Sequence, residues 1–139
     1  GWGLESSLEL EKHCALVLDI HHHWVRTGEY IQANDDRVKR VIDSWRGVRP
    51  TMHYSYSRDE HLAVANLGDK THTEMHDIKM LLERGCKKQK LRAHSDLLPN
   101  AKVNDWALSF GEHFDIQTEA KGKNMAAEQL YRQHIENSV

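Results

Sequence analysis

A short apolar run that ends in an aspartate and a histidine triplet constrains this chain more than any other feature of its sequence. Ala15–Leu18 has the composition of a buried strand, and Asp19 and His21–His23 follow it almost directly. The junction therefore places a carboxylate and imidazoles at the carboxyl end of a strand. Carboxylate oxygen and neutral imidazole nitrogen are ligands that zinc, manganese and iron accept in proteins. The junction predicts a metal site. An accidental polar loop or a purification tag is the less consistent interpretation, because tags lie at chain termini.

Hydrophobic periodicity predicts strands and helices in alternation. The predicted strands are Ala15–Asp19, Arg49–Ser55 and Phe114–Glu119. The predicted helices are Leu4–Lys12, the segment from the Asp35–Asp36 cap to Gly47, Met75–Gly85, Val103–Phe110 and Gly122–Asn137. Aspartates can cap a helix at its start, and a glycine can end it. This alternation predicts an α/β fold of parallel strands with helical crossovers.

Composition favours one compact domain. The chain has 139 residues, 39% of them hydrophobic, and a net charge of -2 with histidine neutral, which suits a single domain over residues 1–139. No stretch approaches the length of a membrane span, and the first residues lack the pattern of a secretory leader. Cys14 and Cys86 are too few for a disulfide framework, so we expect two isolated thiols in an intracellular protein. The charge gives no global signature of a nucleic-acid binder, so any such binding has to be local.

Five ligand-type side chains are expected at one rim of the predicted sheet, because chemistry in parallel α/β proteins gathers at the carboxyl ends of strands. They are Asp19, His22, His53, His94 and Glu119. His94 follows a long connection from the second strand and is expected to fold back over the same rim. The histidines expected to be exposed or to cap helices are His13, His61, His72, His76, His113 and His134.

Four segments, taken in order, match one known family. They are Leu16–His23, Met52–Ser55, Ala93–Asp96 and Asp115–Lys123. In sequence and in order they resemble the ultraviolet damage endonucleases, which are metal-dependent DNA repair enzymes built on a TIM-type (β/α) barrel. The first and last segments are the more specific.

The resemblance implies an endonuclease that nicks damaged double-stranded DNA beside ultraviolet lesions. It implies up to three divalent metal ions, manganese first and zinc or magnesium as alternatives, on Asp19, His22, His53, His94 and Glu119. The further candidates for metal or substrate contacts are His21, His23 and Asp96. Such an enzyme is expected in the cytoplasm or at the nucleoid.

The chain differs from the family pattern in its length, at Thr51 and in residues 58–92. A barrel of this type is about twice as long as this chain. We therefore expect the C-terminal portion of the barrel, about three strands with crossover helices, completed by an N-terminal half or by a second copy. Thr51 stands where the family usually has a lysine close to the metals. Residues 58–92 are interpreted as an inserted connection.

Local basic and aromatic side chains are candidates for DNA contacts. The basic candidates are Lys87, Lys88, Lys90, Arg92, Lys121 and Lys123. The run from Lys87 to Arg92 is equally consistent with a solvated charged surface. Trp24, Tyr54 and Tyr56 could stack on an unpaired base, although core packing is the more frequent role of such aromatics.

Two other functions remain open from the sequence. An apurinic-site endonuclease or a sugar isomerase of the same barrel class would also use ions at a barrel rim. A non-catalytic metal-binding piece would need a partner chain, because an open three-stranded sheet leaves unpaired edges.

Overall fold

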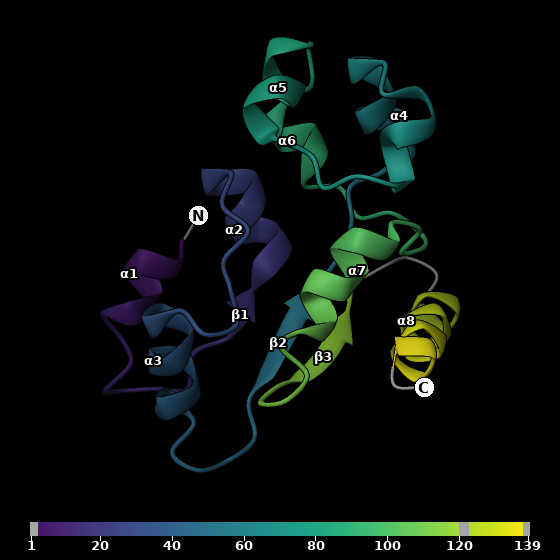
Figure 1. The fold of residues 1–139 in the computed structure, drawn as a ribbon. Coiled ribbons are helices and arrows are strands. Elements are labelled where there is room, and N and C mark those ends of the chain that lie inside the picture. The colour runs from purple at the N-terminus through teal and green to yellow at the C-terminus, as the bar shows by residue number, and fades with distance from the viewer. Residues whose placement is uncertain (1–2, 120–122, 138–139) are drawn as a thin grey trace.

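Three short parallel strands lie at the centre of the structure, a computed structural model that describes residues 3–119 and 123–137 (Figure 1). They are β1 (Leu18–Asp19), β2 (Thr51–Tyr54) and β3 (Asp115–Thr118), in the order β1-β2-β3. Leu18 lies opposite Met52, and Met52 lies opposite Ile116. Helices lie between successive strands along the chain. The predicted α/β fold with parallel strands and helical crossovers is confirmed.

The first strand is shorter than predicted, because the residues before it are attached to a helix. The backbone nitrogen of Leu16 donates to Ser44 Oγ over 2.9 Å, and the indole of Trp45 donates to the Leu16 carbonyl over 2.7 Å. Both backbone groups of Leu16 are therefore used outside the sheet, and Val17 is 53% exposed. Only Leu18 and Asp19 remain to pair with β2.

Helices predicted from local signals form close to their predicted positions. α3 (Asp36–Ser44) begins where the Asp35 side chain accepts from the backbone nitrogen of Arg37. The remaining ones are α1 (Leu4–Leu8), α5 (Ile78–Glu83), α7 (Ala101–Leu108) and α8 (Lys123–Asn137). Asp77 caps α5 and Asn100 caps α7, so both start at a side-chain cap rather than at the first apolar residue.

The histidine triplet lies in a helix that the sequence analysis did not predict. α2 (Ile20–Thr27) starts directly after β1, and Gly28 ends it with a φ of 81°. A Cβ at Gly28 would come within 2.5 Å of the Ile78 side chain, so a larger residue fits neither the backbone nor the space. Because the triplet is helical, His21 and His23 are buried while His22 is half-buried.

Residues 58–92, interpreted from the sequence as an inserted connection, form a helical lobe beyond the carboxyl ends of the strands (Figure 1). Its elements are α4 (Asp59–Leu62), the 3₁₀ helices η1 (Ala63–Ala65) and η2 (Gly68–His72), α5, and α6 (Lys88–Leu91). Hydroxyl groups from the core hold it: Tyr56 donates to the Thr71 carbonyl and Tyr30 donates to the His76 carbonyl, each over 2.7 Å.

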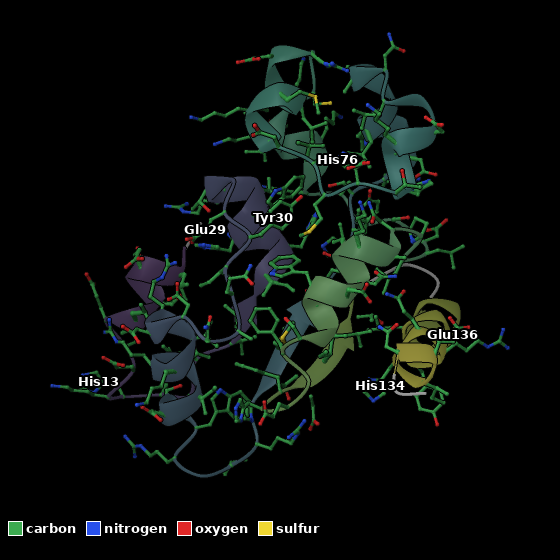
Figure 2. All side chains as sticks on the ribbon, viewed as in Figure 1. His13, Glu29, Tyr30, His76, His134 and Glu136 are labelled. Carbon is green, nitrogen blue, oxygen red and sulfur yellow. The ribbon has the colours of Figure 1, made fainter. Side chains whose placement is uncertain are left out.

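His76 is buried where the lobe meets the rest of the molecule (Figure 2). Its Nε2 contacts the Thr71 carbonyl at 3.0 Å. The expectation that His76 is exposed or caps a helix is therefore wrong, because this histidine is part of the junction that anchors the lobe. His13, in contrast, is exposed as expected.

One hydrophobic core joins the sheet and the helices, with Leu18, Met52, Tyr54 and Phe110 among its most buried members. Cys14 is exposed and Cys86 is buried, both as free thiols, as expected. Among the residues that the structure describes, no helix has the length and apolar character needed to span a membrane.

Candidate metal centre

A carboxylate and an imidazole stand side by side where β1 and β2 end, and a second carboxylate follows β3. Asp19 is the register partner of His53. The backbone nitrogen of Glu119 donates to the Tyr54 carbonyl over 2.9 Å, which extends the β2–β3 ladder past the strand end. Side chains two residues apart on a strand share a face, and Gln117 is the register partner of His53. Asp19, His53 and Glu119 therefore form one row on one face, which we call the carboxyl-edge row.

The centre of this row is a close pair without hydrogen-bond geometry. His53 Nδ1 lies 3.0 Å from Glu119 Oε1. Both atoms are buried, and neither has a hydrogen-bond partner within residues 3–119 and 123–137. The two atoms are within ion-pair distance, but buried polar atoms that form no hydrogen bond are costly, so the pair requires an explanation. Two donors that bind one ion at about 2.1 Å, at the right angle of octahedral coordination, lie about 3 Å apart, so the distance fits a divalent cation such as Mn²⁺ or Mg²⁺.

Burial and neighbouring charges shift the pKa of Glu119. Burial raises the pKa of Glu119, and the neighbouring Asp19 carboxylate raises it further, whereas His53 and His94 lower it. Three of the other four predicted ligands thus lie close enough to Glu119 to shift its pKa. A cation at the row would remove the repulsion between the two carboxylates.

His94 returns from the helical lobe to this edge, as the sequence analysis expected. It forms an isolated antiparallel bridge with Ser57, the third residue after β2. The His94 ring lies edge-on to the His21 ring, with centroids 6.1 Å apart. Burial lowers the pKa of His21 to about 4, although Asp19 raises it, so His21 is neutral at pH 7.

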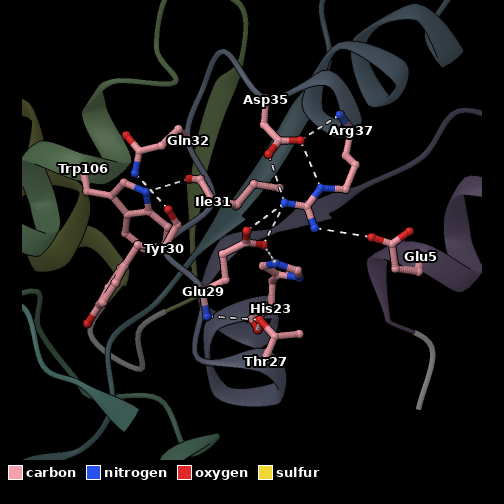
Figure 3. Close-up of polar contacts among 10 residues, drawn as sticks. All are labelled: Glu5, His23, Thr27, Glu29, Tyr30, Ile31, Gln32, Asp35, Arg37 and Trp106. Atoms are coloured by element: carbon pink, nitrogen blue, oxygen red, sulfur yellow. Dashed lines mark hydrogen bonds and ion pairs between the residues drawn. The ribbon is translucent and has the colours of Figure 1, made fainter. Parts of the chain in front are cut away.

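The three histidines of the triplet have different surroundings. His22 is half-buried in the first turn of α2, and its backbone nitrogen donates to Asp19 Oδ1 over 2.9 Å. His21 is buried and contacts Ser57. His23 Nε2 contacts Glu29 Oε1 at 2.7 Å, and Glu29 also binds Arg37 (Figure 3). The structure thus places His23 in a separate polar cluster beside α3.

The row and its neighbours do not close into a coordination shell. Within the part of the chain that the structure describes, no three His, Cys, Asp or Glu side chains converge tightly enough to hold one ion. Asp96 is exposed and lines an open groove with Arg58 and Ser95. Thr51 is half-buried two residues before His53, on the same face of the strand.

The aromatic candidates for base stacking belong to the core. Tyr54 is fully buried on the face opposite His53, and its hydroxyl donates to Asn104 Oδ1 over 2.7 Å. Trp24 and Tyr56 are each only 5% exposed. None of the three can stack on a base in this structure, because strand alternation and the packing of α2 turn them inward. Core packing, the alternative interpretation, is confirmed.

The basic run is on the surface. Lys87, Lys88, Lys90 and Arg92 are all exposed, in and beside α6. Lys88 Nζ donates to the Arg26 carbonyl over 3.2 Å, which ties α6 to the end of α2. Lys121 and the side chain of Lys123 lie outside the described residues.

Sequence reasoning missed the two polar groups that surround the triplet. Ser57 contacts His21 across 36 positions of sequence, and Glu29 binds both His23 and Arg37. Serine after a strand and a glutamate in a loop are common, so no pattern in the sequence marks either of them.

One family model, described as UV-endonuclease UvdE, matches residues 1–138. The match spans the carboxyl-edge row, the histidine triplet and His94. No curated protein and no solved structure matches the chain.

Proposed function

Because the chain belongs to the UV-endonuclease UvdE family, we propose that it nicks DNA beside ultraviolet lesions with divalent metal ions held at the carboxyl-edge row. The observation that supports the metal dependence is a pair of buried atoms, His53 Nδ1 and Glu119 Oε1, which lie 3.0 Å apart and form no hydrogen bond within residues 3–119 and 123–137. A divalent cation would bind both atoms at once. The carboxylate suits manganese and magnesium, and the imidazole suits zinc.

Asp19, His22, His53, His94 and Glu119 would hold the metal. When bound, divalent ions supply a nucleophile at neutral pH and offset the charge on the phosphoryl oxygens. Asp19 and Glu119 would balance the positive charge of the ions. Each imidazole would bind through one ring nitrogen. We propose manganese as the first choice, with up to three ions.

The sheet is proposed to be part of a TIM-type barrel. Two features support this: the strands are parallel in sequential order with helices between them, and the candidate ligands lie at their carboxyl ends. An N-terminal half or a second copy of the chain would then supply further strands.

Damaged double-stranded DNA is the proposed substrate, and α6 is the proposed phosphate contact. The basic run ends only two residues before His94, so a strand bound along α6 passes close to the metal ligands. Lysine and arginine bind phosphates by releasing counterions, without sequence preference.

A nicking assay on supercoiled plasmid tests this function. We expect irradiated plasmid to be nicked in Mn²⁺, untreated plasmid to stay closed, and chelation to abolish nicking. The matched variants are Glu119→Gln and Glu112→Gln, because Glu112 is exposed and precedes β3 at the opposite end of the strand. Glu119→Gln should reduce nicking by at least about tenfold, and Glu112→Gln should leave it unchanged. Equal nicking of irradiated and untreated plasmid, or faster nicking of depurinated than of irradiated plasmid, would contradict the proposal.

A further inference from the structure

A single buried hydroxyl joins three segments near the carboxyl-edge row. Ser57 lies just after β2 and is 2% exposed. Its Oγ donates to the Leu91 carbonyl at the end of α6 over 2.7 Å. The same oxygen lies 3.0 Å from His21 Nε2 in α2. The backbone of Ser57 bridges to His94. Residues from α2, α6 and the segment that carries His94 therefore meet at Ser57.

These contacts determine which nitrogen of His21 carries the proton. A serine hydroxyl has one hydrogen, and a carbonyl can only accept. The Ser57 hydrogen is used by the Leu91 carbonyl. His21 Nε2 must therefore be the donor to Ser57 Oγ, which makes the neutral ring the Nε2–H tautomer.

The His21 ring in turn packs against His94. The two rings meet at an interplanar angle of 78°, with centroids 6.1 Å apart. His21 also lies near Trp24, at a centroid distance of 6.0 Å. The backbone beside His94 is also held, because Ser95 donates from its nitrogen to the Tyr56 carbonyl over 2.7 Å. Trp24 limits the movement of the His21 ring, and His21 limits the movement of the His94 ring.

We infer that Ser57 and His21 are positioning residues, which hold His94 beside the carboxyl-edge row so that it can bind metal. The inference rests on the proposed function, because it takes His94 as a ligand. Neither residue is assigned a contact with the reacting phosphate. Partners of this kind behind a ligand contribute about 10- to 100-fold to metal affinity.

Ser57→Ala tests the inference against a close control, Ser55→Ala. Ser55 is also buried, at 1% exposure, and its hydroxyl has no hydrogen-bond partner among the residues described. The measurement is the Kd for Mn²⁺, from the electron paramagnetic resonance signal of free Mn²⁺ well below the melting temperature of each variant. We expect Ser57→Ala to weaken binding about 10- to 100-fold, and Ser57→Thr, which keeps the hydroxyl, to recover most of the loss. Ser55→Ala should bind like the wild type. Equal affinity in the two alanine variants would overturn the inference.

Two readouts without metal separate this inference from the proposed function. Nitrogen chemical shifts of the His21 ring should show a protonated Nε2 in the wild type. Amide hydrogen exchange at Ser95 should be faster in Ser57→Ala than in Ser55→Ala. A protonated Nδ1 with an unprotonated Nε2, or equal exchange in both variants, would refute the positioning role. Failure of the wild type to bind Mn²⁺ would instead refute the proposed function.

Discussion

At the scale of the residue, Asp19 has a structural role that can be separated from its proposed chemical one. Its Oδ1 caps α2 by accepting from the backbone nitrogen of His22, which leaves a second carboxylate oxygen near Glu119. A carboxylate can serve both purposes because each oxygen has two lone pairs. Capping needs only an oxygen acceptor, whereas metal binding also needs the negative charge.

Asp19→Asn and Asp19→Ala should therefore differ in stability but not in metal binding. Asparagine caps a helix about as well as aspartate, so Asp19→Asn should change the free energy of unfolding little. Asp19→Ala removes the cap and should cost about 1 kcal/mol. Both variants should lose affinity for Mn²⁺, as measured by titration beside urea denaturation. A metal affinity preserved in Asp19→Asn would remove Asp19 from the site.

At the scale of the element, polar clusters join helices that are distant in sequence. Arg37 contacts Asp35 Oδ2 at 2.9 Å and Glu29 Oε1 at 2.8 Å, and its Nη1 lies 3.3 Å from Glu5 Oε1 (Figure 3). One guanidinium thus connects α1, α3 and the loop after α2. Hydrogen bonds from Arg37 hold the pKa values of Asp35 and Glu29 below their ordinary range.

Arg37→Gln should destabilise the fold in a pH-dependent way. A carboxyl group whose pKa is lower in the folded state stabilises the fold above its unfolded pKa, and this contribution disappears as the pH falls through the folded value. We expect a loss of about 1–2 kcal/mol at pH 7, which shrinks below about pH 4. Arg40→Gln breaks an exposed pair with Glu11 and should matter less. Urea denaturation between pH 3 and pH 7 measures both, and a loss independent of pH would argue against the ion pairs.

The basic run at α6 predicts a salt-dependent DNA affinity. Each phosphate contact contributes a slope of about -0.9 to the logarithm of the binding constant against the logarithm of salt concentration. Replacing Lys87 and Lys90 with alanine should reduce that slope by up to about 1.8 for an irradiated duplex. Replacing Lys12 and Lys39, which are exposed beside α1 and on α3, is the matched control and should leave the slope unchanged. Identical slopes for both double variants would show that α6 does not contact the backbone.

Elements with local signals could be predicted from the sequence, and those that depend on distant contacts could not. α3 was predictable because its cap and its buried residues Val38 and Val41 lie within one short segment. α2 was not, because its apolar residues continue the strand pattern before it. The carboxyl-edge row was predictable because parallel strands place their ends together. The Ser57–His21 contact was not, because it joins residues 36 positions apart.

At the scale of the whole molecule, an open groove lies beside β3, the strand at the outer edge of the sheet. The groove beside β3 and α8 is lined by Phe114, Ile116, Leu130 and Tyr131, and Tyr131 is 63% exposed. Exposed strand edges and apolar grooves favour association with another chain. We therefore expect self-association, or binding of a chain that adds further strands.

Sedimentation velocity measures the oligomeric state of the chain and so tests this expectation. The purified chain should sediment as a dimer or larger species at micromolar concentration. Tyr131→Glu should shift it toward the monomer, because a charge in the apolar groove opposes association. Lys12→Glu, a charge change on the far surface, should have no such effect. A well-folded monomer at every concentration would contradict the prediction.

The number of Mn²⁺ ions bound per chain, determined by native mass spectrometry on the wild type and on Glu119→Gln, decides whether the carboxyl-edge row is a metal centre. We expect at least one ion on the wild type and fewer on the variant, because Glu119 contributes one of the two close buried atoms at the carboxyl-edge row. Equal stoichiometry in the two proteins, or a wild type without metal, would contradict the assignment of this row as the metal centre.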